Sequence, residues 1–404
     1  MDITFRYCNN CVMPNTKPDL FFDEGGVCDA CRSAELKKNI NWESRKKEFE
    51  NEVVAKYKGK NPGNYDCIIP VSGGKDSYYQ AYMIKKVHGM NPLLVSFEVT
   101  TKNDVGMKNR ENIKKAFGCD MIVFEKNPEV YKKMCLRGFR DVGDNEWPNH
   151  LGIFTVPVRL AVQMKIPLII WGENSQLEYG GPKVSRMKNV LDRRWLEEFG
   201  GLLGLRIEDM IGYDGITKED LVSYFYPSDE ELKNVGVKGV FLGYYFKWDA
   251  RPQVDLMKKY GFSVKEDGPV EGTYINYEKL DEDLEVIHSY LKFVKFGFGR
   301  ATDHACTDIR NGRLAREDAV KLVKKYDGKY PWKAVKKCLG YFGMTQQEFD
   351  KITDSFTNKA LFLTDAQGKF LRDKDYNLLK RYADYGSGLK NPVTPKKESI
   401  QIPL

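Results

Sequence analysis

Residues 65–79 read YDCIIPVSGGKDSYY, and this stretch decides the fold. Its first half, Tyr65 to Val71, is a short apolar run with β-branched residues, which is typical of a buried strand. Its second half, Ser72 to Ser77, places two glycines among small polar residues and opens a helical pattern. Glycines let the backbone approach an anion, and N–H groups at a helix N-terminus supply donors. The stretch therefore predicts a strand, a phosphate-binding loop and a helix in succession.

Strand and helix patterns alternate after this loop. Strands separated by helices imply right-handed crossovers, so the fold class is α/β with a doubly wound parallel sheet. Ligands bind such sheets at the carboxyl ends of the strands. The expected strands lie at 92–99, 120–125, 167–174 and 239–246, the expected helices at 103–117 and 156–165, and a helical region begins at about residue 277.

Four of the nine cysteines form two CxxC pairs near the N-terminus. Cys8 and Cys11 are separated from Cys28 and Cys31 by residues 12–27, a spacing expected of a tetrahedral site with four thiolate ligands. Four protein ligands leave no open position, so we expect a structural Zn²⁺ ion. An iron–sulfur cluster is the alternative for the same ligand set.

Length and charge limit the remaining possibilities. A chain of 404 residues suits two or three domains. The net charge of +7 fits an anionic small molecule, and because no block of five consecutive basic residues occurs, no nucleic-acid partner is expected. Without a secretory signal or a long apolar stretch, we expect a cytoplasmic protein with no membrane partner.

The expected parts are a zinc-binding segment with a linker helix (1–60), the α/β domain (61–276), a helical substrate or partner region (277–385) and a tail (386–404).

The glycine loop is not a Walker A motif, because Ile69 stands where that motif needs glycine and Asp76 follows Lys75. SGGxDS at a strand-to-helix turn instead resembles the PP-loop of ATP pyrophosphatases, which have an adenine nucleotide alpha hydrolase-like fold. The resemblance implies cleavage of ATP between its α- and β-phosphates, with Lys75 and Asp76 in the chemistry and Asp76 positioning Mg²⁺. The residues implied to hold ATP and pyrophosphate are Ser72, Gly73, Gly74, Lys75, Asp76 and Ser77.

Most of the chain resembles one family, the N-acetyl sugar amidotransferases of bacterial surface-polysaccharide (LPS O-antigen) and nonulosonic acid pathways. The resemblance implies that ATP adenylates the acetamido carbonyl of a nucleotide-linked N-acetyl sugar. Ammonia then replaces the carbonyl oxygen and gives an acetamidino sugar, with release of AMP and pyrophosphate. The motifs that carry the resemblance are YCxxCVMP (7–14), VCDAC (27–31), PVSGGKDS (70–77), WGEN (171–174) and FGFGRATDHACTDIRNG (296–312).

The sequence offers no glutaminase nucleophile. Asp2 excludes an exposed N-terminal cysteine, and the five cysteines outside the CxxC pairs do not lie in glycine-rich elbows. The family resemblance implies a separate glutaminase subunit similar to that of imidazole glycerol phosphate synthase. A cyclase-like subunit as a further partner stays open.

Polar residues in two other segments are candidates for the acceptor site. Glu173 and Asn174 end a strand on the ligand-binding edge, although a turn or helix cap explains them equally well. The segment 299–310, expected to be a glycine-rich loop near the PP-loop, suits an anionic substrate or a proton relay, with a solvated surface loop as the alternative. His304 fits proton transfer because imidazole titrates near neutrality. The candidates in this segment are Arg300, Thr302, Asp303, His304 and Arg310.

Other notable side chains are expected to be structural. His88, His150 and His288 are isolated in the sequence and predict packed or surface residues. The aromatic residues at 244–248 are expected in the core.

Two other functions fit parts of the pattern. A tRNA sulfur transferase also combines a PP-loop with zinc-binding cysteines, but it usually needs a further reactive cysteine near the loop. A non-enzymatic zinc scaffold would not require an intact loop motif.

Overall fold

The computed structural model describes residues 5–101, 103–173, 190–191 and 201–382. Its centre is a sheet with strand order β3-β2-β1-β4-β6-β5. The first five are parallel, and β5 runs antiparallel to β6. The parallel, doubly wound sheet is therefore confirmed. Its strands are β1 (Cys67–Pro70), β2 (Pro92–Phe97), β3 (Met121–Phe124), β4 (Leu168–Trp171), β5 (Val190–Leu191) and β6 (Lys238–Phe241).

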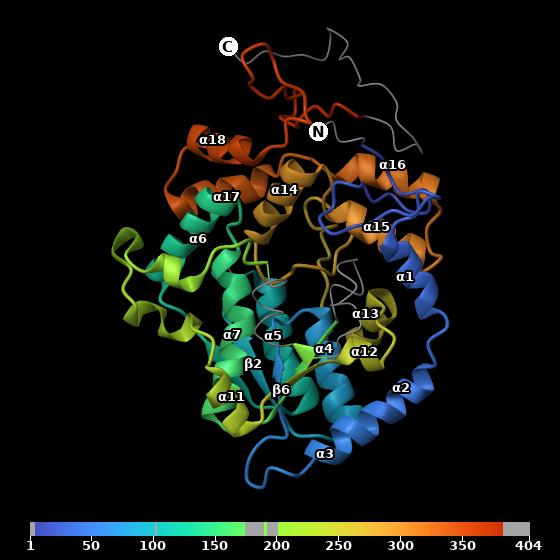
Figure 1. Ribbon diagram of the computed structural model, residues 1–404, viewed down its shortest axis with the longest axis vertical. Coiled ribbons are helices and arrows are strands. Elements are labelled where there is room, and N and C mark those ends of the chain that lie inside the picture. Colours follow the sequence, from blue (N-terminus) through green and yellow to red (C-terminus); the bar gives the residue numbers. More distant parts are fainter. Residues whose placement is uncertain (1–4, 102, 174–189, 192–200, 383–404) are drawn as a thin grey trace.

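Helices cover both faces of the sheet (Figure 1). The N-terminal part contains α1 (Asp29–Lys37), α2 (Trp42–Phe49) and α3 (Ala55–Tyr57). The α/β part contains α4 (Lys75–Ala81), α5 (Asp104–Phe117), α6 (Pro128–Val142), α7 (Trp147–Gln163), α11 (Asp229–Val235), α12 (Leu242–Tyr245) and α13 (Ala250–Lys258). The C-terminal part contains α14 (Glu285–Phe296), α15 (Arg300–Arg310), α16 (Arg316–Tyr326), α17 (Trp332–Phe342) and α18 (Gln346–Phe356).

The strands are apolar on both faces because each face has its own core. Ile68 of β1 belongs to a core shared with α6 and α7, whereas Ile69 belongs to a core shared with α4 and α5. Successive strand side chains point to opposite faces, so a fully covered strand reads as a continuous apolar run. This is why the sequence predicts β1 as a buried strand.

Two expected elements differ from the structure. The strand expected at 239–246 ends at Phe241, where the chain turns into α12. The prediction of a loop at 299–310 is wrong, because residues 300–310 form helix α15. Asp327, which is distant in sequence, accepts hydrogen bonds from the N–H groups of Gly299 and Ala301 at 2.8 and 2.9 Å. This remote cap satisfies the first turn of α15, and no local pattern announces it.

The C-terminal helices pack on the α/β part instead of forming a separate core. Phe139 of α6 packs against Phe342 and Phe349, which belong to α17 and α18. The boundary predicted at 276/277 therefore passes through one continuous hydrophobic core. The N-terminal cysteine segment packs against α15 and α16 in a third, smaller core. The predicted tail at 386–404 lies outside the described residues. Among the described helices, none combines the length and the apolar character needed to cross a bilayer.

Candidate active site

The SGGKDS loop joins β1 to α4 at the carboxyl edge of the sheet. The N–H of Ser72 donates to Oγ of Ser77 at 3.0 Å, and the N–H of Gly74 donates to Oγ of Ser72 at 3.2 Å. Gly73 has φ +89°, and a Cβ there would lie 3.0 Å from the backbone nitrogen of Arg110. Glycine is therefore required at this position by both its backbone conformation and its close contact with α5.

Lys75 and Asp76 are fixed by neighbours from distant parts of the chain. Nζ of Lys75 lies 2.7 Å from Oδ2 of Asp76 and 2.7 Å from Oε1 of Glu278. The indole N–H of Trp248 donates to Oδ1 of Asp76 at 3.2 Å. Lys75 is 7% exposed, so its charge is held in a largely buried group of carboxylates.

The segment 278–285, here named the strap, crosses the carboxyl ends of β1 and β2. Glu278 contacts Lys75, and the carboxyl of Asp281 forms a hydrogen bond with Ser72. Glu282 accepts hydrogen bonds from the N–H groups of Thr100 and Thr101, which follow β2, at 2.8 and 3.1 Å. The strap thus closes over the loop from the side of the C-terminal region.

Gly106 of α5 allows the strap to approach this closely. A Cβ at Gly106 would lie 2.5 Å from Cα of Asp281 and 2.5 Å from the carbonyl oxygen of Leu280.

A polar pocket opens beside Lys75, between the end of β4, the segment after α12, the strap and α15. Its cavity volume is about 40 Å³. Carboxylates and cations share its wall, so it suits a polar ligand. Its lining residues are Lys75, Glu173, Trp248, Asp249, Ala250, Ile275, Tyr277, Glu278, His304, Thr307, Asp308 and Arg313.

The two central carboxyl groups of the pocket, those of Glu173 and Glu278, have pKa values shifted in opposite directions. Burial and the neighbouring charge of Asp76 raise the pKa of Glu173 to about 7, although Lys75 opposes this shift. Burial also disfavours ionisation of Glu278, but Lys75, His304 and Arg300 outweigh it and hold the pKa of Glu278 well below its usual range. Glu173 can therefore exchange a proton near neutral pH, whereas Glu278 stays a carboxylate.

Of the α15 candidates, His304 lines this pocket and Arg300 contacts Glu278 in its wall. Nδ1 of His304 lies 2.7 Å from Oγ1 of Thr273, and its ring lines the pocket. Arg300 donates to Oε2 of Glu278 at 2.8 Å, so a single carboxylate links it to Lys75. Burial lowers the pKa of His304, which favours the neutral imidazole that a proton acceptor needs.

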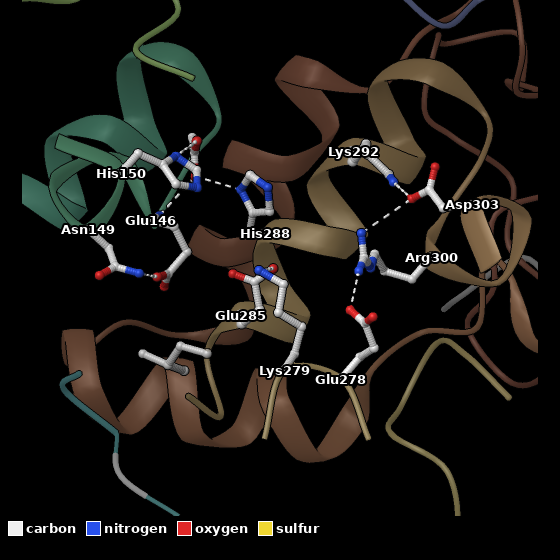
Figure 2. A network of polar contacts seen from close by, with 12 residues as sticks. Glu146, Asn149, His150, Glu278, Lys279, Glu285, His288, Lys292, Arg300 and Asp303 are labelled. Atoms are coloured by element: carbon white, nitrogen blue, oxygen red, sulfur yellow. Dashed lines mark hydrogen bonds and ion pairs between the residues drawn. The ribbon is translucent and has the colours of Figure 1, made fainter. Parts of the chain in front are cut away.

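The other candidates of α15 face elsewhere. Oγ1 of Thr302 donates to Asp327 at 2.5 Å as part of the helix cap. Asp303 pairs with Lys292, and neither Thr302 nor Asp303 lines the pocket. Figure 2 shows the chain of contacts from Glu278 through Arg300 to Asp303 and Lys292.

Arg310, expected to bind substrate, does not line the pocket and lies beside the cysteines. Its guanidinium lies 3.9 Å from Sγ of Cys11 and 4.0 Å from Sγ of Cys28. Helix α15 places it at the opposite end from Arg300. A guanidinium beside sulfur ligands stabilises their negative charge, so Arg310 belongs to the cysteine site.

The four cysteines of the CxxC pairs form a compact, buried site. Their sulfur atoms all lie within 4.8 Å of one another, and those of Cys11 and Cys28 are 3.8 Å apart. A tetrahedral Zn²⁺ with metal–sulfur bonds of about 2.3 Å separates its ligand atoms by about 3.8 Å. The N–H of Cys28 also donates to Sγ of Cys8 at 3.2 Å. The residues therefore fit a structural zinc ion.

A second, smaller hollow adjoins the other side of Ser72. An ion pair between Arg110 and Glu98 at 2.5 Å forms part of its wall. Its lining residues are Ser72, Ser96, Phe97, Glu98, Val99, Gly106, Met107, Arg110 and Asp281.

Sequence reasoning missed several residues of the site. Trp248 was expected in the core but lines the pocket and contacts Asp76. Glu278 and Asp281 lie in a run of acidic residues directly before a long helix, and such a run reads as an ordinary helix start. Only the density of acidic residues at 278–285 could have drawn attention to them. Asn174 lies outside the described residues.

His150 and His288 were expected to be isolated, but both contact Asp144. His88 packs between Phe49 and Phe246, as a packed histidine should.

Residues 271–375 match a protein family described as LPS biosynthesis protein WbpG-like, C-terminal domain. This segment contains the strap and helices α14 to α18. The match therefore includes Glu278, Arg300 and His304.

Similarity to individual proteins covers smaller parts. An uncharacterized protein of Methanocaldococcus jannaschii is 31% identical over 133 residues, which are 32% of this chain and 47% of that protein. The match thus spans about half the length of this relative.

Two solved structures are similar to part of the chain. The NH3-dependent NAD synthetase from Campylobacter jejuni is 14% identical, with a TM-score of 0.29 over 49% of this chain and 94% of its own. The NMN synthetase from Francisella tularensis is 14% identical, with a TM-score of 0.28 over 49% of this chain and 94% of its own.

Proposed function

We propose that this protein is an ATP-dependent amidotransferase that converts the acetamido group of an N-acetyl, nucleotide-linked sugar into an acetamidino group. One observation carries the proposal. The segment that matches LPS biosynthesis proteins contributes Glu278 to Lys75 of the SGGKDS loop, at 2.7 Å. A loop of the ATP pyrophosphatase type and a segment typical of surface-polysaccharide synthesis thus form one site.

The reactants bind in different parts of the site. The N–H groups of the loop and Lys75 bind the pyrophosphate portion of ATP. The pocket lined by Glu173 and His304 takes the acetamido group. Asp76 and Glu278 present carboxylate oxygens, the ligands that Mg²⁺ prefers, and a bound Mg²⁺ screens the charge of the departing pyrophosphate.

Adenylation makes the amide oxygen a leaving group. The acetamido oxygen attacks the α-phosphorus of ATP, and the bond from that phosphorus to the β-phosphate breaks, which releases pyrophosphate. The resulting imidate gives its N–H proton to His304, whose neutral imidazole lines the same pocket. Lys75 stabilises the negative charge that develops on pyrophosphate.

Ammonia then completes the exchange. Its nitrogen attacks the imidate carbon, the C–O bond breaks, and AMP leaves with the former carbonyl oxygen. Glu173 accepts the proton that the attacking nitrogen loses, because a pKa of about 7 suits transfer at neutral pH. His304 lies across the same pocket as a second proton acceptor.

The distribution of cysteines argues against the competing thiolation reaction. Sulfur transfer needs an accessible thiol near the activated carbonyl. The thiols outside the zinc site are buried, and none lines the pocket: Cys67, Cys119, Cys135, Cys306 and Cys338.

The reaction can be tested with purified protein, ATP, Mg²⁺ and candidate nucleotide-linked N-acetyl sugars. Mass spectrometry should detect replacement of the amide oxygen by NH when ammonium is added. Glutamine should support the same product only after a glutaminase subunit is supplied. Glutamine-dependent turnover by this chain alone would contradict the two-component reaction, and AMP formation dependent on tRNA and a sulfur donor would favour thiolation.

A further inference from the structure

A second cluster of potential metal ligands lies apart from the four cysteines. Oδ1 of Asp144 is 2.8 Å from Nδ1 of His288, and Oδ2 of Asp144 is 3.3 Å from Nδ1 of His150. The two imidazole rings are nearly perpendicular, with centroids 5.0 Å apart. The three side chains come from the start of α7, the turn before it and α14. Residues far apart in sequence thus direct nitrogen and oxygen atoms toward one point.

The contact of His150 with Asp144 is longer than that of His288. Nδ1 of His150 is buried and has no hydrogen-bond partner among the described residues, although a carboxylate oxygen lies 3.3 Å away. Two ligands of a tetrahedral ion with bonds of about 2.0 Å are separated by about 3.3 Å. The contact between His150 and Asp144 therefore has the spacing of two atoms that share a cation, whereas Asp144 and His288 form a hydrogen bond at 2.8 Å.

Two buried carboxylates, from Asp144 and Glu285, lie at the cluster. Asp144 is 2% exposed, and within the described part of the chain its ion-pair partners are the two histidines and no lysine or arginine. Glu285 lies close to both histidines and pairs with Lys279 at 2.9 Å (Figure 2). Buried carboxylates need compensating positive charge. A divalent cation would supply it.

We propose that Asp144, His150 and His288 bind a second divalent metal ion, distinct from the zinc of the four cysteines. Two imidazole nitrogens and one carboxylate oxygen form a ligand set suited to a first-row transition ion such as Zn²⁺, Mn²⁺ or Fe²⁺. Both histidines are partly exposed, with side-chain exposures of 19% and 29%, so the ion can enter from solvent. This proposal does not depend on the amidotransferase reaction.

The proposed ion lies where α7 meets the end of the strap. Glu285 is the last residue of the strap and the first of α14, and His288 follows in the same turn. Lys279, the partner of Glu285, follows Glu278 in the strap, and Glu278 contacts Lys75. An ion at the cluster therefore ties the start of α7 to the end of the strap.

The test uses the full-length protein loaded with Co²⁺, which reports its ligands by absorption. Cobalt in the four-cysteine site gives intense thiolate-to-metal bands, whereas cobalt on nitrogen and oxygen gives only weak visible bands. We expect the wild-type protein to bind two ions per chain, one with each signature. His150→Gln and His288→Gln should each weaken the second ion at least ~10-fold and leave the thiolate bands unchanged. His88→Gln is the matched control, because His88 packs on the opposite face of the sheet.

Metal analysis after desalting gives an independent count. Retention of the second ion by both variants would overturn the site. So would a wild-type protein that binds only the thiolate ion during titration with Co²⁺, Zn²⁺ or Mn²⁺. A lower Tm of the variants with unchanged metal content would assign the histidines to packing alone and would also overturn the proposal.

Discussion

Lys75 is the residue where the loop and the C-terminal region meet. Two carboxylates, from Asp76 and Glu278, lie 2.7 Å from its ammonium group. A phosphate ligand that binds Lys75 must compete with them or bring a cation that satisfies them. The positive charge of Lys75 is already neutralised by these carboxylates, so the loop suits an anion that binds together with a divalent metal ion.

Replacement of Asp76 tests the chemistry of the loop without removing core volume. Asp76→Asn keeps the shape of the side chain and the acceptor for Trp248 but removes the negative charge. We expect the rate of pyrophosphate release to fall about 10²-fold or more, with little change in Tm. Asp120→Asn is the control, because Asp120 hydrogen-bonds with Tyr65 near the amino ends of the strands. Wild-type pyrophosphate release by Asp76→Asn would contradict the proposed role of the loop.

Glu173 predicts a pH dependence of stability. Burial and the charge of Asp76 raise its pKa from 4.5 to about 7 in the folded protein, so folding favours the protonated carboxyl. Ionisation therefore costs stability as pH rises from about 4.5 to 7, by up to about 3 kcal/mol. Glu173→Gln, which cannot ionise, should gain stability relative to the wild type across this window.

Urea unfolding at several pH values measures the difference. The free energy of unfolding of Glu173→Gln should exceed that of the wild type by more at pH 8 than at pH 5. Parallel pH profiles for the two proteins would show that Glu173 keeps an ordinary pKa.

At the scale of elements, the sequence pattern predicted those helices and strands that local interactions determine. The β1 strand, the glycine loop and the helix after it were predictable because apolar runs and glycines are local signals. Helix α15 was not, because its cap comes from Asp327 across the fold. The position of the strap was also not predictable, because its contacts with Ser72, Lys75 and Thr100 depend on tertiary packing.

Gly106 gives a test of the position of the strap. Alanine normally stabilises a helix by about 1 kcal/mol relative to glycine. At Gly106, however, the added Cβ would lie 2.5 Å from the strap backbone. We expect Gly106→Ala to lose about 1–3 kcal/mol of stability and at least ~10-fold in kcat/KM, because the strap must move away from Lys75.

Gly340→Ala is the matched control for this substitution. Gly340 lies in α17, and an added Cβ there meets nothing within 4 Å. Chemical denaturation and steady-state kinetics of both variants provide the comparison. A Gly106→Ala protein that is as stable and active as Gly340→Ala would show that the strap does not rest on α5.

At the scale of the whole molecule, three separately predicted parts converge on α15. Its first residue, Arg300, contacts Glu278 of the strap, His304 lines the pocket beside Lys75, and its last residue, Arg310, contacts the cysteine site. The sequence showed each part by its own motif, but only the fold shows that one helix connects them. The N-terminal cysteine segment therefore supports a wall of the pocket, although it lies at the opposite end of the chain from the C-terminal helices.

The fate of the acetamido oxygen tests the proposed reaction most directly. An N-acetyl sugar nucleotide labelled with oxygen-18 in the acetamido carbonyl would be incubated with the protein, ATP, Mg²⁺ and ammonium, and the products analysed by mass spectrometry. If the carbonyl oxygen attacks the α-phosphorus, the label must leave in AMP, and the acetamidino sugar must be unlabelled. Label that stays in the sugar, or that appears in pyrophosphate or inorganic phosphate, would contradict adenylation of the acetamido group.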